Sequence, residues 1–213
     1  MNFDDLLTEY APLLPVEDCR TLVAHQASDV FALWRAWERS SGIPQEVPFW
    51  ATVWPAARLT ATFLISRPEF VENRRILEIG SGGGIASIAA AGAGARLCIA
   101  NDIAPAAQLV ALKNAKANSV SISIDTRDLL SDDIELDIDV VLVADMFYEK
   151  EYSNRLLGML TKYHKMGVDV LIADGGRPFA PTWGMEVLTQ RTLSVCSDVE
   201  GVRHKTVRLM RMN

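Results

Sequence analysis

The residues best suited to chemistry in this chain are a glycine-rich turn and the acidic residue that follows it. Residues 76–84 read Ile-Leu-Glu-Ile-Gly-Ser-Gly-Gly-Gly. The short apolar run predicts a buried strand. The glycines predict a tight turn whose N–H groups, at the start of a helix over residues 85–93, face the carboxyl edge of a sheet. Asp102 ends the next expected strand, where a carboxylate can accept hydrogen bonds from both hydroxyls of a ribose. The unit therefore predicts a nucleoside-binding site.

The glycine spacing separates two classes of cofactor. Gly80, Gly82 and Gly84 give G-x-G-x-G, whereas the dinucleotide fingerprint G-x-G-x-x-G needs a glycine at residue 85, which is Ile85. A pyrophosphate-binding turn, and with it an NAD-dependent oxidoreductase, is therefore the poorer fit. With the acidic Glu78 at the centre of the strand, the motif resembles the first motif of class I S-adenosylmethionine-dependent methyltransferases. The alternative is that these residues form only a glycine-rich turn and a surface aspartate, with no role in binding.

Composition bounds the class of protein. The chain has 213 residues, 49% of them hydrophobic, which is enough for one domain with a substantial core. Because it has no run of about eighteen apolar residues and begins with an acidic segment, neither a membrane span nor a leader peptide is expected, and a cytoplasmic location is predicted. The scattered cysteines and histidines show no ligand spacing, so neither a metal site nor a disulfide framework is expected.

The charge balance bears on the substrate. A formal net charge of -6 disfavours a nucleic-acid substrate, whose phosphates favour a basic surface, and suits a cationic group such as lysine. Net charge alone leaves room for a local basic patch. Nothing in the sequence indicates an assembly, and a monomer is expected.

The elements that must position these residues follow from periodicity and turn signals. Residues 3–14 and 17–40 predict two helices, which form an N-terminal helical extension over residues 1–47. Pro55 is well placed to begin the next helix. Strands and helices then alternate, with a helix from Pro105 to about residue 118, strands at 120–126, 139–144 and 168–173, and a helix over 151–165.

The C-terminal part changes character. Two strands at about 192–198 and 205–211, joined by Glu200-Gly201, predict an antiparallel hairpin. Taken together, the order of elements predicts an α/β, Rossmann-like class I methyltransferase fold, with a mostly parallel seven-stranded sheet that ends in this hairpin.

Four segments narrow the resemblance. Pro-Phe-Trp-Ala-Thr-Val-Trp-Pro-Ala-Ala-Arg-Leu (48–59), the glycine motif, Ala-Asp-Met-Phe-Tyr-Glu (144–149) and Ala-Asp-Gly-Gly-Arg (173–177) occur in this order. The set is similar to methyltransferase family 16, and within it to lysine methyltransferases of the electron transfer flavoprotein beta subunit and their bacterial relatives. The resemblance implies a methyltransferase domain over residues 48–213. It does not extend to residues 1–47, which border the acceptor site.

Roles on the cofactor side follow from this resemblance. It implies that Glu78 and the backbone of Gly80, Gly82 and Gly84 hold the methionine end of S-adenosylmethionine, and that Asp102 holds the ribose.

The resemblance also implies a further set of cofactor contacts. Asp128 accepts a hydrogen bond from the adenine amine, with Leu129 beside it, and Ala144 ends the neighbouring strand. A solvated loop acid is the alternative for Asp128. Leu129 stands where many family members carry a tryptophan, so adenine stacking is aliphatic. Trp54 covers the methionine moiety, and its face can stabilise a sulfonium cation.

On the acceptor side, Asp145 and Tyr148 are the predicted catalytic residues. A lysine amine, with an ordinary pKa of about 10.4, must lose a proton before its lone pair can attack a methyl carbon. Asp145 can orient the incoming ammonium group, and Tyr148 can shape the pocket. The alternatives are a strand-end cap for Asp145 and core packing for Tyr148. Arg177 is either substrate-side or structural.

The leading prediction is an S-adenosylmethionine-dependent protein-lysine N-methyltransferase with a protein acceptor, an electron transfer flavoprotein beta subunit by family resemblance. Methylation of a small-molecule amine or of a ribosomal protein is a second hypothesis. A non-catalytic S-adenosylmethionine-binding module is a third.

Overall fold

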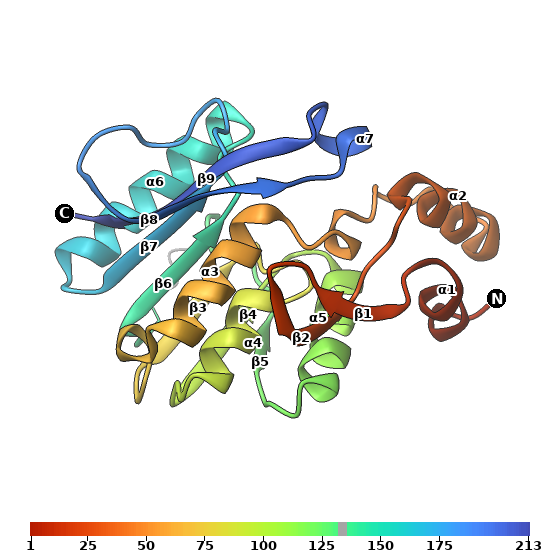
Figure 1. Ribbon diagram of the computed structural model, residues 1–213, viewed down its shortest axis with the longest axis horizontal. Helices are drawn as coiled ribbons and strands as arrows, with labels where there is room; N and C mark the ends of the chain where they lie inside the picture. The colour runs from red at the N-terminus through yellow and green to blue at the C-terminus, as the bar shows by residue number, and fades with distance from the viewer. Residues whose placement is uncertain (132–135) are drawn as a thin grey trace.

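The computed structural model describes residues 1–131 and 136–213, and its centre is a seven-stranded sheet (Figure 1). The strand order is β5-β4-β3-β6-β7-β9-β8. The parallel strands are β3 (Arg75–Ile79), β4 (Leu97–Asn101), β5 (Ser123–Asp125), β6 (Val140–Ala144) and β7 (Asp169–Asp174). β9 (His204–Met212) runs antiparallel to both β7 and β8 (Met185–Ser194). The predicted fold class is confirmed.

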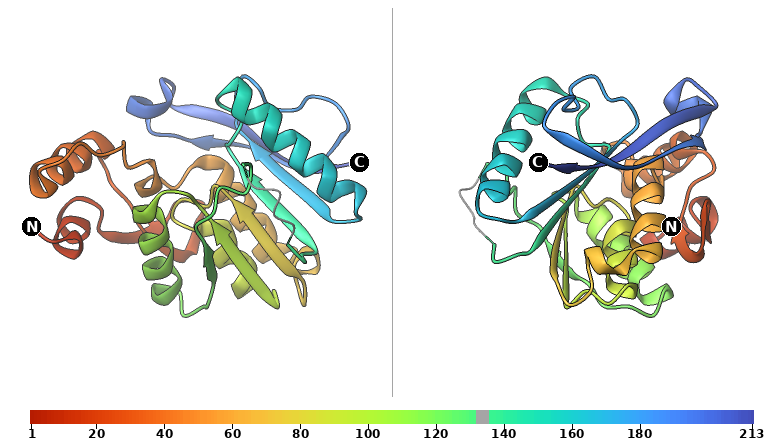
Figure 2. Two further views of the ribbon diagram at one scale, coloured as in Figure 1. Left: turned by 180° about the vertical axis from the view of Figure 1, so that it is seen from behind. Right: turned by 60° about the vertical axis from the view of Figure 1, so that its left-hand side comes forward.

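Helices cover both faces of the sheet. The right-hand view of Figure 2 shows α6 (Lys150–Lys165) on one side. On the other side lie α3 (Pro55–Ser66), α4 (Ile85–Gly92) and α5 (Pro105–Ala117). Two single turns, η1 (Phe49–Ala51) and η2 (Pro68–Phe70), flank α3.

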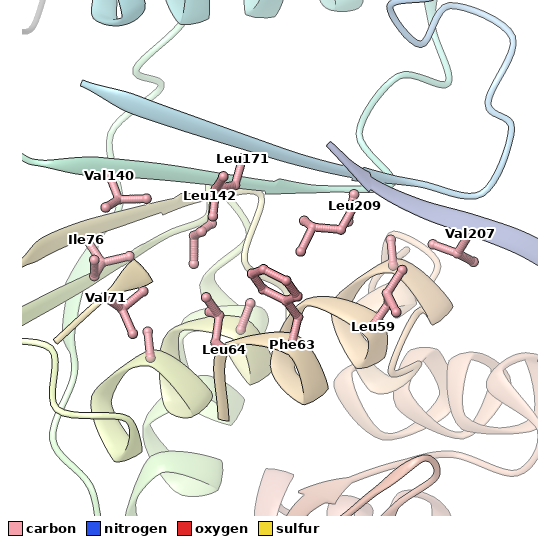
Figure 3. Packing of buried hydrophobic residues seen from close by; sticks show 14 of the residues in the cluster. Leu59, Phe63, Leu64, Val71, Ile76, Val140, Leu142, Leu171, Val207 and Leu209 are labelled. Atoms are coloured by element: carbon pink, nitrogen blue, oxygen red, sulfur yellow. The ribbon is translucent and has the colours of Figure 1, made fainter. Parts of the chain in front are cut away.

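Alternation along each strand divides the core between the two faces. Ile76, Val140 and Leu142 face α3, where Leu59 and other apolar residues of that helix meet them (Figure 3). The intervening residues of the same strands face α6 and form a second cluster, which includes Leu77, Val141, Val143, Leu156 and Leu160. Each such leucine is fully buried, which stabilises the fold by about 1.5–3 kcal/mol per side chain. This two-sided burial explains why the strands read as continuous apolar runs.

The N-terminal region differs from the prediction. It consists of α1 (Phe3–Tyr10), a hairpin of β1 (Leu13–Val16) and β2 (Cys19–His25), and α2 (Val30–Ser41). The predicted helix over 3–14 is right only for its first part, and the predicted helix over 17–40 is wrong for its first half.

Tertiary contacts explain this difference. In β2, Leu22 and Ala24 are buried at strand spacing, but the stretch is too short for its apolar residues alone to distinguish a strand from a helix. The side chain of Asn118, which caps the C-terminus of α5, accepts from the Val23 N–H at 2.9 Å and donates to the Val23 carbonyl at 2.7 Å. An amide from a distant helix thus satisfies the strand's backbone, and local periodicity does not reveal it.

Residues 1–47 pack closely against the rest of the chain. Leu6, Leu7 and Leu33 are buried together with Trp50 and with alanines of α5. The buried Arg58 of α3 donates to Glu17, at the hairpin turn, at 2.5 Å. A domain boundary at residue 48 stays a prediction.

The C-terminal hairpin is present but begins earlier than predicted. β8 spans Met185–Ser194, and a short helix α7 (Ser197–Glu200) stands where the strand at 192–198 was expected to end. β8 lies at the edge of the sheet, and only one of its residues is buried. Its sequence therefore shows little alternation of polar and apolar residues. In the described part of the chain, no helix has both the length and the apolar character needed to cross a bilayer.

Candidate active site

A cavity of about 930 Å³ opens at the carboxyl edge of β3, β4 and β6. This volume lies within the range of small-molecule sites. Its walls come from the segment before α3, the glycine-rich turn, the loops after β4, β5 and β6, and Arg177. Ten of the eleven predicted site residues line it: Trp54, Glu78, Gly80, Gly82, Asp102, Asp128, Leu129, Ala144, Asp145 and Tyr148. The fold thus brings together positions that lie up to 94 residues apart in the sequence.

The glycine-rich turn has a backbone conformation that favours glycine. Gly80 and Gly82 have φ angles of 65° and 51°, in the left-handed region that favours glycine. A Cβ on Gly80 would lie 2.3 Å from the side chain of Met146, which the sequence reading did not single out. The turn therefore exposes backbone to the cavity at close range.

Gly84 is the predicted cofactor residue that does not line the cavity. It precedes α4 with φ of 77°, and a Cβ there would lie 3.0 Å from the Cβ of Ala111 in α5. Its contribution is close packing of two helices. A direct cofactor contact of Gly84 stays a prediction.

Asp102 follows β4 and connects the end of that strand to the glycine-rich turn. Its Oδ2 accepts from the Gly82 N–H at 2.8 Å and its Oδ1 from the Ala104 N–H at 2.9 Å. A carboxylate has about four lone-pair sites, so each oxygen can accept one hydrogen bond more. Burial raises the pKa of Asp102. The carboxylate holds the turn and keeps acceptor capacity toward the cavity.

Glu78 is almost fully buried under the same turn, with 2% exposure. Its Oε2 accepts from the Ser87 N–H at 2.8 Å and from the Ser87 hydroxyl at 2.6 Å, which fixes the first turn of α4. Burial raises the pKa of Glu78 to about 7, although the bonds from Ser87 oppose the shift. A cation at the methionine end would favour its ionised form.

The adenine side is built by the loop after β5. Asn101 donates to the carbonyls of Asp125 and Arg127 at 3.0 and 2.9 Å, and this fixes the loop. Leu129 is 4% exposed and lines the cavity, as an aliphatic stacking surface requires. Asp128 is exposed and accepts from the Leu130 N–H at 3.0 Å. That exposure fits the solvated-loop alternative as well, so its adenine contact stays a prediction.

Asp145 follows β6 with φ of 57°, a conformation that few residues other than glycine adopt. The bend leads its carboxylate to two other elements. Its Oδ2 accepts from the Ala56 N–H in the first turn of α3 at 3.4 Å, and its Oδ1 accepts from the Gly175 N–H at 3.1 Å. Burial raises the pKa of Asp145, and Arg177 opposes the shift. The capping alternative describes these bonds, and the acceptor-side role stays a prediction.

Tyr148 is 57% exposed at the cavity wall, so the core-packing alternative is wrong. Its ring is stacked on Tyr152 with centroids 6.0 Å apart. Burial of the hydroxyl raises the pKa of Tyr148, and the carboxylates of Asp102, Glu149 and Glu46 raise it further. Tyr148 therefore stays a neutral hydrogen-bonding group at physiological pH.

Trp54 stands between two partners at the cavity wall. Its ring lies 5.8 Å from that of Phe49 and 5.1 Å from the guanidinium carbon of Arg177. Its indole N–H donates to the Phe49 carbonyl at 3.2 Å. These contacts fix the ring at the cavity wall, and its cover of the methionine moiety stays a prediction.

The N-terminal region, which the sequence analysis places beside the acceptor site, also contributes to the cavity. His25, Trp37 and Glu46 line the cavity. Asn114 in α5 is fully buried; it donates to the Gly83 carbonyl at 2.9 Å and accepts from the His25 N–H at 2.8 Å. A buried polar residue within an apolar helix was the one available signal.

The residues present fit S-adenosylmethionine. A nucleoside needs an acceptor for its ribose, an apolar surface for its base and close access to backbone, which Asp102, Leu129 and the glycine turn supply. Fold and site together define a class I methyltransferase.

Comparison with known proteins gives the family. Residues 46–186 match a family model described as lysine methyltransferase, and the chain belongs to this family. The electron transfer flavoprotein beta subunit lysine methyltransferase of Rattus norvegicus is 33% identical over 144 residues, which cover 67% of this chain and 56% of the rat protein. The Homo sapiens protein of the same name is 34% identical over 145 residues, with 67% and 55% covered. The chain spans about half the length of these relatives.

Solved structures support the fold. The 16S rRNA N2 G1207 methyltransferase of T. thermophilus superposes with a TM-score of 0.52 at 18% identity, over 76% of this chain and 43% of that one. At this identity the likeness concerns the fold alone. Family membership confirms the resemblance to the lysine methyltransferase family that the sequence motifs indicate.

Proposed function

We propose that this chain is a protein-lysine N-methyltransferase and that its acceptor is an electron transfer flavoprotein beta subunit. The observation that carries the proposal is the arrangement of the cavity, in which the ribose-side Asp102 and the acceptor-side pair Asp145 and Tyr148 line one space. The names of the rat and human relatives support the choice of acceptor.

Cofactor binding would rest on the glycine turn and its carboxylates. Gly80 and Gly82 offer backbone, Glu78 a charge for the amino group, Asp102 an acceptor for the ribose, and Leu129 a surface for the base. S-adenosylmethionine supplies a methyl group on a sulfonium sulfur. In the transfer the lysine nitrogen forms a bond to the methyl carbon, the carbon–sulfur bond breaks, and the amine proton passes to solvent.

Asp145 and Tyr148 would position the acceptor amine. A carboxylate at the cavity wall attracts the ammonium form of lysine, and partial desolvation then favours loss of its proton. The Tyr148 hydroxyl, at the cavity wall, can accept a hydrogen bond from the amine and so direct its lone pair, so that alignment supplies most of the rate enhancement. No strong base is needed at the site.

Mass spectrometry tests the proposal. The pure chain is incubated with S-adenosylmethionine and a purified beta subunit, and with a cell extract that contains labelled cofactor. We expect a mass increase of one or more methyl groups on a lysine of the beta subunit. Label confined to small metabolites, or to a ribosomal protein, would contradict the proposed acceptor. Cofactor binding without any transfer would make the chain a binding module.

A further inference from the structure

Arg177 stands at the junction of the loop after β7, α7 and the segment before α3. The loop fixes where its side chain begins, because Asp174 Oδ1 accepts from the N–H groups of Gly176 and Arg177 at 2.6 and 2.8 Å. The Arg177 side chain is only 18% exposed, and it lines the cavity. The loop therefore fixes the backbone of Arg177, and the surrounding residues cover most of its side chain.

The guanidinium group contacts three partners at once. Its Nε lies 3.4 Å from Asp145 Oδ1, and its Nη2 donates to Glu200 Oε1 at 2.8 Å. Its central carbon lies 5.1 Å from the centre of the Trp54 ring. A planar, permanently charged fork can serve two carboxylates and an aromatic face together, which the single ammonium of lysine cannot. Arg177 thus connects the residues predicted on the acceptor side and on the cofactor side.

We propose that Arg177 is a positioning residue for methyl transfer, which keeps Asp145 ionised and holds the Trp54 ring in place. The inference rests on the proposed function for its catalytic part. Sequence reasoning left Arg177 open between a substrate-side and a structural role. The contacts favour a third role, in which it acts through two other residues.

The charges around Asp145 show why this arginine matters. Among the described residues, the groups that face it are Asp174 at the end of β7, Arg177 from the loop after β7 and Glu200 from α7. Lys205 of β9 pairs with Glu200 at 2.5 Å. Burial raises the pKa of Asp145, Arg177 lowers it, and Glu200 raises it again. Without Arg177, Glu200 would keep its pair with Lys205, and Asp145 would keep its bonds from the Ala56 and Gly175 N–H groups.

The consequence for function follows from this balance. The side chains of Asp145 and Glu200 are 3% and 5% exposed, so water compensates little for a lost partner. Asp145 would then take up a proton at higher pH than in the wild type, and a neutral carboxyl cannot attract an ammonium group. The backbone donors Ala56 and Gly175 would remain, so the fold around Asp145 would be kept.

Carboxyl titration in the absence of cofactor tests the electrostatic part. Carbon-13 NMR follows the aspartate carboxyl groups of wild type, Arg177→Met and Arg177→Lys, and the Asp145 resonance is assigned by its loss in Asp145→Asn. We expect the Asp145 midpoint to rise by about one pH unit or more in Arg177→Met, and to stay within about half a unit in Arg177→Lys. An unchanged midpoint in Arg177→Met would overturn the inference.

Transfer kinetics test the catalytic part, with Arg211→Met as the matched control. Arg211 of β9 donates to Asp169 of β7, at the edge of the sheet opposite to Arg177. We expect the acid limb of kcat to move to higher pH in Arg177→Met by the shift that NMR measures, so that kcat falls about tenfold or more below the limb and recovers above it. Arg211→Met should leave the pH profile unchanged.

Two outcomes would count against the account in different ways. A loss in Arg177→Met that is equal at every pH would show a packing role and overturn the inference while the proposed function stands. A wild type that binds S-adenosylmethionine and methylates nothing would overturn the proposed function and, with it, the catalytic role of Arg177. The carboxyl titration would then still measure the coupling of Arg177 to Asp145.

Discussion

At the two edges of the central sheet, the pKa values of buried and half-buried carboxylates shift in opposite directions. At the amino edge, Asp139 accepts from the Arg75 backbone N–H at 2.8 Å and from its guanidinium, and these bonds hold the pKa of Asp139 well below its usual range. Burial alone would raise the pKa of Asp169, but bonds from Arg74 and Arg211 lower it.

At the carboxyl edge, Glu78, Asp102 and Asp145 are more deeply buried and held mainly by backbone N–H groups or a serine, and the pKa of each is raised. Both edges have a cavity, of about 780 Å³ at the amino edge and 930 Å³ at the carboxyl edge. The difference teaches that the arginine-paired Asp139 and Asp169 stabilise the sheet, whereas Glu78 and Asp102, held by backbone N–H groups or a serine, keep acceptor capacity for a ligand. Asp145 combines backbone donors with a pair to Arg177.

The largest expected effect is loss of cofactor binding in Asp102→Ala. The substitution removes the acceptor for the ribose and releases the Gly82 and Ala104 N–H groups, so affinity for S-adenosylhomocysteine should fall about 100-fold. Isothermal titration calorimetry measures this loss. The matched variant at the other edge, Asp169→Ala, should bind within about twofold of wild type. Equal losses in both variants would erase the distinction between the edges.

Glu78→Gln should weaken the same binding about tenfold at pH 8, because it removes the charge that faces the amino group. In the wild type, affinity should fall as the pH drops through about 7, since the raised pKa of Glu78 means that its carboxylate is protonated below that value. The variant should show no such pH dependence. Calorimetry between pH 6 and 8 decides, and parallel pH profiles would remove Glu78 from the site.

The same residue gives a stability prediction with a defined sign. The pKa of Glu78 is higher in the folded than in the unfolded state, so the folded state binds more protons between about 4.5 and 7. Stability of the cofactor-free wild type should therefore decline across this window as the pH rises, and Glu78→Gln should flatten the decline. Thermal unfolding at several pH values measures it. A steeper decline in the variant would contradict the assignment.

At the amino edge, Asp139→Asn should lower the free energy of unfolding by about 1 kcal/mol at pH 7, after allowance for solvent screening of a partly exposed pair. Because the pKa of Asp139 is lowered on folding, its contribution is present above about 3.8 and is lost as the pH falls further. Urea unfolding at pH 7 and pH 3 measures both values. Cofactor affinity at pH 7 should not change. A loss of affinity would contradict the claim that carboxylates at the amino edge serve stability alone.

The smallest expected effect is that of Tyr148→Phe. The ring keeps its stack on Tyr152, and only the hydroxyl at the cavity wall is lost. We expect a two- to fivefold rise in KM for the protein acceptor, roughly 0.5–1 kcal/mol, with cofactor affinity unchanged. Steady-state kinetics measure it. A loss of cofactor affinity instead would move Tyr148 to the cofactor side.

Sequence reasoning found the site because its signals are short-range. A strand, a glycine turn and an acid in fixed order specify where Gly80 and Asp102 must lie, since parallel strands end at one edge. Tyr148 was found through its motif, although its exposure could not be read from the sequence. The packing of Gly84 against Ala111 of α5 could not be read from the sequence, because glycine spacing alone does not show which helix lies beside the turn.

The missed features depend on contacts between distant segments. β2 is a strand because Asn118, 95 residues later, bonds to its backbone, and β8 is a polar edge strand that β9 specifies by pairing. Met146 and Asn114 reach the glycine turn only once β6 and α5 have packed beside it. Periodicity carries no information about such partners.

A crystal structure of the protein with S-adenosylhomocysteine tests the central claim most directly. The account predicts density for the nucleoside at the carboxyl edge, with the ribose hydroxyls within hydrogen-bonding distance of Asp102 and the base against Leu129. Density among Arg74, Arg75 and Asp139 at the amino edge, with the glycine turn untouched, would contradict it.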